Sequence, residues 1–181
     1  MKAPFWVRGL FTILFIGFLT APVLAGTFYL HDHEAYWWYV VEDDGFSVVV
    51  PNNAERYVEK RIFGQKLLEM TWNDARVIMQ VSFISGQDVE TLREALSSQW
   101  EPLVSDVTMI SDREITTSND VPAYFYAFEG TGMDGQRGML RSVFFSRDDA
   151  VVQLLMLLPS ADYQGDLREY WLRAVNEFEW N

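Results

Sequence analysis

Alternation of apolar and polar side chains predicts a chain built mostly from strands. Segment 46–51, FSVVVP, is largely apolar and is closed by a proline and two asparagines, which predicts a short strand. Three more runs, at 56–63, 66–72 and 76–84, are separated by Gly-Gln and Asn-Asp turns, so we expect hairpins. In the last of these runs one face is apolar and the other nearly so, which favours a place well inside a sheet.

Helical spacing of apolar residues occurs twice. After Asp88, a candidate N-cap, apolar side chains recur every three or four residues and predict an amphipathic helix that ends near Pro102. Segment 160–178 repeats this spacing as far as Phe178 and predicts a second helix. The extended runs between the helices are 107–117, 122–130, 137–146 and 150–158. The last run, AVVQLLMLL, has the pattern of a central strand buried on both faces.

The order of these elements predicts one antiparallel sheet with helices on its faces. Most strands follow each other through short connections, and each amphipathic helix needs a sheet to cover its apolar side. A chain of 181 residues suffices for one domain with a sizeable core. We expect a lead-in segment at 26–44 and the domain proper at 45–181.

Residues 1–25 have the pattern of a secretory signal. Two basic residues without an acid precede the apolar run 10–19, and small residues surround Ala25. We predict cleavage after Ala25 and a periplasmic or secreted protein. The apolar run has 10 residues, about half of what a membrane-spanning helix needs. The alternative is an anchor in the inner membrane formed by residues 10–25.

Charge and composition narrow the classes of function. Lys and Arg number 14 against 26 Asp and Glu, so the net charge of −12 disfavours nucleic acid and anionic membrane surfaces as partners. We therefore expect membrane contact only if the N-terminal segment is retained. Hydrophobic residues make up 49% of the chain, which predicts a folded protein, and the absence of cysteine excludes disulfides.

Several segments together resemble one known superfamily. They are DGFSVVVP, DVETLREAL, VPAYFYAFEG, RGMLRSVFFSRDDAVVQLLMLLP and LREYWLRAVNEFEW, spread over residues 44–180. In order and hydrophobic pattern they resemble the PsbP-like and DcrB-like superfamily. The resemblance implies an α+β protein with an α/β/α sandwich, whose central antiparallel sheet has about six to seven strands with helices on its faces. It also implies binding or assembly rather than catalysis, with no catalytic residues and no cofactor to carry over.

The two histidines are the candidate metal ligands. In an extended segment His31 and His33 project to the same side, so they could meet one Zn²⁺ or Cu²⁺ ion with a neighbouring carboxylate. No third histidine and no thiolate follows in the chain. The favoured interpretation is therefore a solvated segment just past the cleavage site.

Catalytic chemistry has little support in the sequence. Without cysteine, and with no histidine beyond residue 33, the domain cannot build a Cys-His pair or an internal Ser-His-Asp triad. Carboxylate pairs at 43–44, 148–149 and 177/179 could serve a hydrolase, but 26 acids make such pairs expected. The first two pairs also lie at turn-like positions, where Asp is favoured.

The candidate partner-binding residues are Trp37, Trp38 and Met133. Adjacent residues of a strand face opposite ways, so either both sides of the tryptophan segment are covered or one ring is available to a partner. Met133 lies in the glycine-rich loop 130–138, and loops concentrate functional contacts. We expect an exported, non-enzymatic protein that binds another envelope protein. The alternatives are a small-molecule or divalent-metal binder and, third, a carboxylate-dependent hydrolase.

Overall fold

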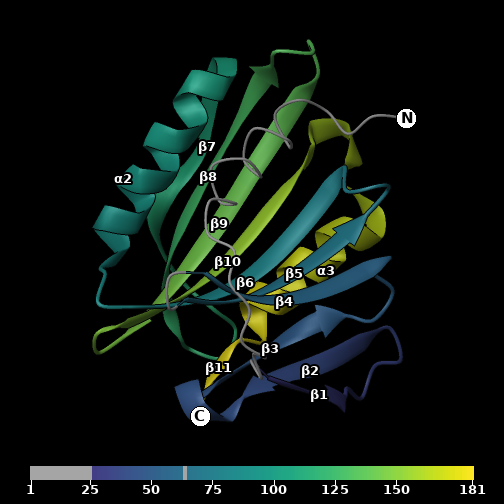
Figure 1. Cartoon of the computed structure of the whole chain (residues 1–181), viewed down its shortest axis with the longest axis vertical. Coiled ribbons are helices and arrows are strands. Elements are labelled where there is room, and N and C mark those ends of the chain that lie inside the picture. The colour runs from purple at the N-terminus through teal and green to yellow at the C-terminus, as the bar shows by residue number, and fades with distance from the viewer. Residues whose placement is uncertain (1–25, 63–64) are drawn as a thin grey trace.

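The structure is a computed structural model that describes residues 26–62 and 65–181 (Figure 1). The predicted signal segment lies outside the described residues. The described chain forms two antiparallel sheets, one of seven strands and one of four, together with helices α2 and α3. An α+β protein with an antiparallel sheet of about six to seven strands was predicted, and the seven-stranded sheet confirms this part of the prediction.

The seven-stranded sheet has the order β4-β5-β6-β10-β9-β8-β7. Its strands are β4 (Arg56–Ile62), β5 (Gln65–Trp72), β6 (Val77–Ser85), β7 (Val104–Thr116), β8 (Pro122–Gly132), β9 (Arg137–Arg147) and β10 (Ala150–Pro159). The predicted central strand is confirmed, because β10 is fourth in this order and eight of its ten residues are buried. Its apolar run is long because both faces of a middle strand are covered.

The turn between β5 and β6 follows from its residues. Asn73, Asp74 and Ala75 have φ angles of 54°, 54° and 64°, in the left-handed region. Asn and Asp adopt this region more readily than other non-glycine residues, so the sequence allows the tight hairpin that it predicted.

The four-stranded sheet was not predicted. Its order is β1-β2-β3-β11, and its strands are β1 (Thr27–Leu30), β2 (Tyr36–Val41), β3 (Phe46–Pro51) and β11 (Glu179–Trp180). The strand predicted at 46–51 is therefore confirmed, but it pairs with the lead-in segment instead of joining the main sheet. All six residues of β3 are buried, so this strand is covered on both faces. A short 3₁₀ turn, η1 (Glu42–Asp44), joins β2 to β3.

Helix α2 (Val89–Trp100) covers one face of the main sheet. Its buried side chains Leu96 and Trp100 pack in a cluster with Phe128 and Phe144 of the sheet. The predicted N-cap is confirmed, because Oδ1 of Asp88 accepts a hydrogen bond of 2.7 Å from the backbone N–H of Thr91. The 3₁₀ turn η2 (Glu101–Leu103) follows and leads into β7.

Helix α3 (Gly165–Asn176) lies on the opposite face. Neighbours on β9 point to opposite sides, and Phe145 belongs to the cluster that holds Trp171 and Ala174 of α3, whereas Phe144 faces α2. In Figure 1 helix α3 lies behind β5 and β6, with the four-stranded sheet below it. The α3 side of the main sheet thus carries a helix and a second sheet, an element that the predicted sandwich lacks.

The predicted helix at 160–178 is too long at both ends. Its first residues form the 3₁₀ turn η3 (Ser160–Asp162), and Gln164 is extended, with φ of −154° and ψ of 172°. Phe178 keeps a buried position beyond the helix, where it stacks on Phe145 at 3.8 Å between ring centroids. The apolar spacing therefore continues past the end of the helix, because Phe178 is buried although it is not helical. No helix within residues 26–62 and 65–181 is long and apolar enough to cross a membrane.

Candidate functional site

Strand β7 is the edge strand on which the candidate site is built. It has 13 residues and pairs with β8 on one side, while its other side has no strand partner in the described sheet. The ladder is irregular in the first half, with shifts between Ser105 and Thr108 and between Met109 and Ser111. Such bulges bend a strand and redirect its side chains. The ladder is regular from Ser111 to Thr116.

The bulged half of β7 presents large apolar side chains to solvent. Val107, Met109 and Ile110 are 47%, 49% and 43% exposed. Strand β7 begins opposite the end of β8, so Met133, which follows β8 and is 72% exposed, lies at the same end of the sheet. We call these four residues the β7 patch. Single exposed apolar residues are common, whereas these four are grouped at one edge and one end of the main sheet.

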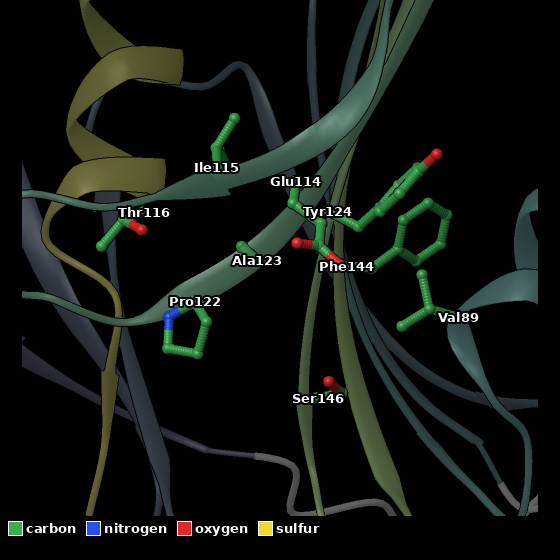
Figure 2. Close-up of a pocket in the computed structure, with 9 residues that line it drawn as sticks. All are labelled: Val89, Glu114, Ile115, Thr116, Pro122, Ala123, Tyr124, Phe144 and Ser146. Atoms are coloured by element: carbon green, nitrogen blue, oxygen red, sulfur yellow. The ribbon is translucent and has the colours of Figure 1, made fainter.

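The regular half of β7 lines a cavity of about 580 Å³. Figure 2 shows the rings of Tyr124 and Phe144 beside Val89, which is the first residue of α2. The lining of the cavity is mostly apolar, and its polar groups are one carboxylate and three hydroxyls. The lining residues are Val89, Glu114, Ile115, Thr116, Pro122, Ala123, Tyr124, Phe144 and Ser146.

A charged cluster adjoins this cavity. The Tyr124 hydroxyl donates a hydrogen bond of 2.7 Å to Oδ1 of Asp112, and Nη1 of Arg93 donates one of 3.3 Å to Oδ2. The bond to Asp112 raises the pKa of the Tyr124 phenol. Asp112 is thus engaged on both oxygens, and Glu114 is the single carboxylate that lines the cavity. A hydrolase with two facing carboxylates is not supported here.

One member of each of the three acidic pairs has a local structural role. Asp44 forms an ion pair of 2.9 Å with Lys66, and Asp148 adopts a φ of 56° in the turn between β9 and β10. Glu177 contacts Nη1 of Arg173 and Nε2 of His31, each at 3.0 Å. Turn formation and ion pairing therefore account for these acids.

His31 is packed rather than solvated, in contrast to the favoured expectation. Its Nδ1 accepts a hydrogen bond of 2.9 Å from the backbone N–H of His33, so Nε2 carries the proton and donates to Glu177 at 3.0 Å. The His31 side chain is 9% exposed, and the residue lies in the connection between the paired strands β1 and β2. Nδ1 of His33 accepts from the N–H of Ala35 at 3.3 Å. Among the described residues no three potential ligands gather around one point, and the metal role of both histidines stays a prediction.

The two tryptophans are both partly buried, so the segment is covered on two sides. The ring of Trp37 packs against Phe28 at 5.3 Å and Tyr57 at 5.5 Å, while Trp38 lies 5.4 Å from the ring of His31. The structure thus corresponds to the packed alternative. A role of either ring in partner binding stays a prediction.

Sequence reasoning found Met133 but missed the rest of the β7 patch. The run 107–117 was assigned to a strand without a position in the sheet. The sequence feature that indicates an edge position is the mixture of Met109 and Ile110 with several charged residues, in contrast to the apolar run of β10. Charged side chains are typical of edge strands.

Comparison with known proteins identifies the fold. No protein-family model matches the chain, and no curated protein matches it in sequence. The solution structure of cyanobacterial PsbP from Synechocystis matches with a TM-score of 0.55 and 8% identity, over 92% of this chain and 99% of that one. A Pseudomonas aeruginosa protein of unknown function matches with a TM-score of 0.38 and 16% identity, over 71% and 85%. The first match agrees with the fold that the sequence resemblance implied.

Proposed function

Starting from this PsbP-like fold, we propose that the protein is an exported, non-catalytic binding protein that docks on another protein of the cell envelope through β7. The observation that carries the proposal is the β7 patch on the bulged half of an edge strand. The secretory pattern at residues 1–25 supports export.

The composition of the β7 patch suits a protein partner. Methionine is enriched at protein interfaces, and its flexible thioether side chain adapts to the shape of a neighbour. Met109 and Met133 supply two such side chains at one end of the sheet. The bulges prevent the first half of β7 from offering a continuous ladder, so contact there is made by side chains.

The cavity beside β7 suggests the chemistry of the partner. Glu114 lies inside it, Asp112 lies beside it, and the whole chain has a net charge of −12. A partner with an apolar anchor flanked by Lys or Arg side chains complements this edge, and opposite charges speed and orient docking.

Affinity capture from envelope extracts tests the proposal. The exported protein carrying Met109→Lys and Ile110→Lys is compared with the unchanged protein. Leu30→Lys is the control, because Leu30 is 88% exposed on β1 in the other sheet. We expect a stoichiometric partner that the control retains and the double variant loses. Capture of no partner, or equal capture by the double variant, would reject docking through β7.

The same cavity supports small-molecule binding as the second candidate function. A concave, partly apolar wall with a few converging polar groups is typical of ligand sites. Glu114, Thr116 and Ser146 provide these groups. A screen of small organic cations by calorimetry, repeated with Glu114→Gln, tests this function; a ligand that binds both proteins equally would place the site elsewhere.

A further inference from the structure

Arg141 is a partly buried cation without a carboxylate partner. It lies on β9 and points to the α3 side, where its guanidinium carbon is 4.8 Å from the ring centre of Phe125, 4.4 Å from that of Tyr163 and 5.8 Å from that of Trp171. Within the described part of the chain, Arg141 forms no ion pair with Asp or Glu at 4.0 Å or less. Arg93, Arg137 and Arg173, in contrast, each pair with a carboxylate.

The hydrogen-bonding capacity of this guanidinium is largely unused. Among the residues that the structure describes, Nη1 donates only to the sulfur of Met139, at 3.8 Å, and a thioether is a weak acceptor. The buried Nε has no hydrogen-bond partner among the described residues. Aromatic faces stabilise the charge but do not accept the five N–H bonds of the planar fork. Buried donors of this kind are normally satisfied, so the unpaired Nε–H of Arg141 is an unusual feature of the described structure.

A second cation approaches the same tyrosine. Burial raises the pKa of the Tyr163 phenol, and the positive charges of Arg141 and Arg168 oppose that rise. Arg168 lies on the first turn of α3, where no side chain caps the helix and where the backbone dipole adds positive potential. Arg168 is thus a second cation beside Tyr163, in a protein whose acids outnumber its Lys and Arg by 26 to 14.

We propose that Arg141, Arg168 and Tyr163 form a binding site for a single oxyanion group, a carboxylate or a phosphate. The guanidinium fork matches the oxygens of either group in a bidentate arrangement. Arg141 supplies the inner donors, Arg168 a donor at the exposed rim, and the Tyr163 hydroxyl a further one. The site lies on the α3 side of the main sheet, so it is independent of β7.

Nuclear magnetic resonance of the exported protein tests the site directly. The Nε–H signal of Arg141 is followed during titration with inorganic phosphate or with acetate, at an ionic strength held constant with chloride. We expect a saturable shift. A response to phosphate alone assigns a phosphate site, and a response to both assigns a general oxyanion site. No shift beyond that caused by chloride would overturn the proposal.

Two variants that each remove one positive charge separate specific binding at the site from the general electrostatic attraction of the protein for anions. Arg168 is exposed, so its replacement leaves the core intact. Arg168→Gln should raise the dissociation constant of the anion at least about tenfold, because a hydrogen bond to a charged group is worth that factor or more. Arg56→Gln removes an exposed arginine from β4, at the other edge of the sheet, and should leave binding unchanged. Equal losses in both variants would also reject the site.

Discussion

At the scale of single residues, Tyr36 shows how β2 is fixed to α3. Its ring is 2% exposed, packs edge-on against Tyr170 at 5.7 Å and lies 4.8 Å from the guanidinium carbon of Arg173. Burial, assisted by the negative charge of Glu169, raises the pKa of Tyr36 from 10.0 to about 12. The folded protein therefore holds this phenolic proton more tightly than the unfolded chain does.

This difference predicts a loss of stability at high pH. Because the folded pKa is the higher one, the stabilisation is complete below pH 10.0 and is lost as the pH rises to about 12. We expect the free energy of unfolding of Tyr36→Phe to fall less steeply over this window than that of the unchanged protein. Urea unfolding at several pH values measures it, and identical slopes for the two proteins would contradict the assignment.

His31→Ala tests whether this histidine is a structural residue. Its ring packs on Trp38 and its Nε2 bonds to Glu177, so we expect a free energy of unfolding lower by about 1–2 kcal/mol, the range for a partly buried hydrogen bond with its packing. His33→Ala is the matched comparison, since His33 is exposed. Equal, negligible changes in both variants would indicate the solvated segment that the sequence favoured.

At the scale of elements, Phe178 joins the two sheets after α3 has ended. It is fully buried, stacks on Phe145 of β9 at 3.8 Å and lies 6.1 Å from Phe46 of β3. We expect Phe178→Ala to lower the free energy of unfolding by about 3–5 kcal/mol, the usual range for a buried phenylalanine. Leu172→Ala on α3, at a side chain 40% exposed, should cost far less. Denaturant unfolding measures both, and a small effect at Phe178 would mean that the sheets are joined elsewhere.

Local patterns predicted most elements because they depend on neighbouring residues. The alternation in β6, the apolar run of β10, and Asp88 before α2 each act within a few positions, and each is present in the structure. The predicted C-terminal end of the second helix was wrong, because Phe178 keeps helical spacing while it packs outside the helix. Apolar spacing indicates which side chains are buried, and side chains beyond the end of a helix can also be buried.

The division of strands between two sheets could not be predicted from local patterns. Strand β3 pairs with β2 and with the two residues of β11, which are far away along the chain. The same limit applies to the proposed site, since Arg141 lies on β9, Tyr163 lies between η3 and α3, and Arg168 lies on α3. Nothing in the sequence around any one of these residues indicates the other two.

At the scale of the whole molecule, the segment before β3 belongs to the fold. Strand β1 pairs with β2 along four residue pairs, and Phe28 packs on Tyr39 at 5.1 Å. We expect deletion of residues 27–34 to lower the midpoint of thermal unfolding by several degrees, because about 1 kcal/mol shifts it by 2–4 °C in a protein of this size. Calorimetry of residues 26–181 with and without this segment measures the effect. An unchanged midpoint would show that the segment is dispensable.

The net charge of −12 predicts how docking responds to salt. A partner with basic side chains is attracted over a distance, and salt screens that attraction. We therefore expect the association rate to fall as ionic strength rises, with a smaller change in the dissociation rate. Surface plasmon resonance with the captured partner measures both rates, and a rate independent of salt would exclude a basic partner surface.

The two bulges of β7 also bear on how copies of this protein avoid one another. A flat edge of 13 residues would offer every neighbouring copy a template for strand addition and, at high concentration, for fibril growth. The shifts near Thr108 and Ser111 interrupt that template. The bulges thereby leave the apolar side chains of this edge exposed without offering other copies a continuous strand to extend.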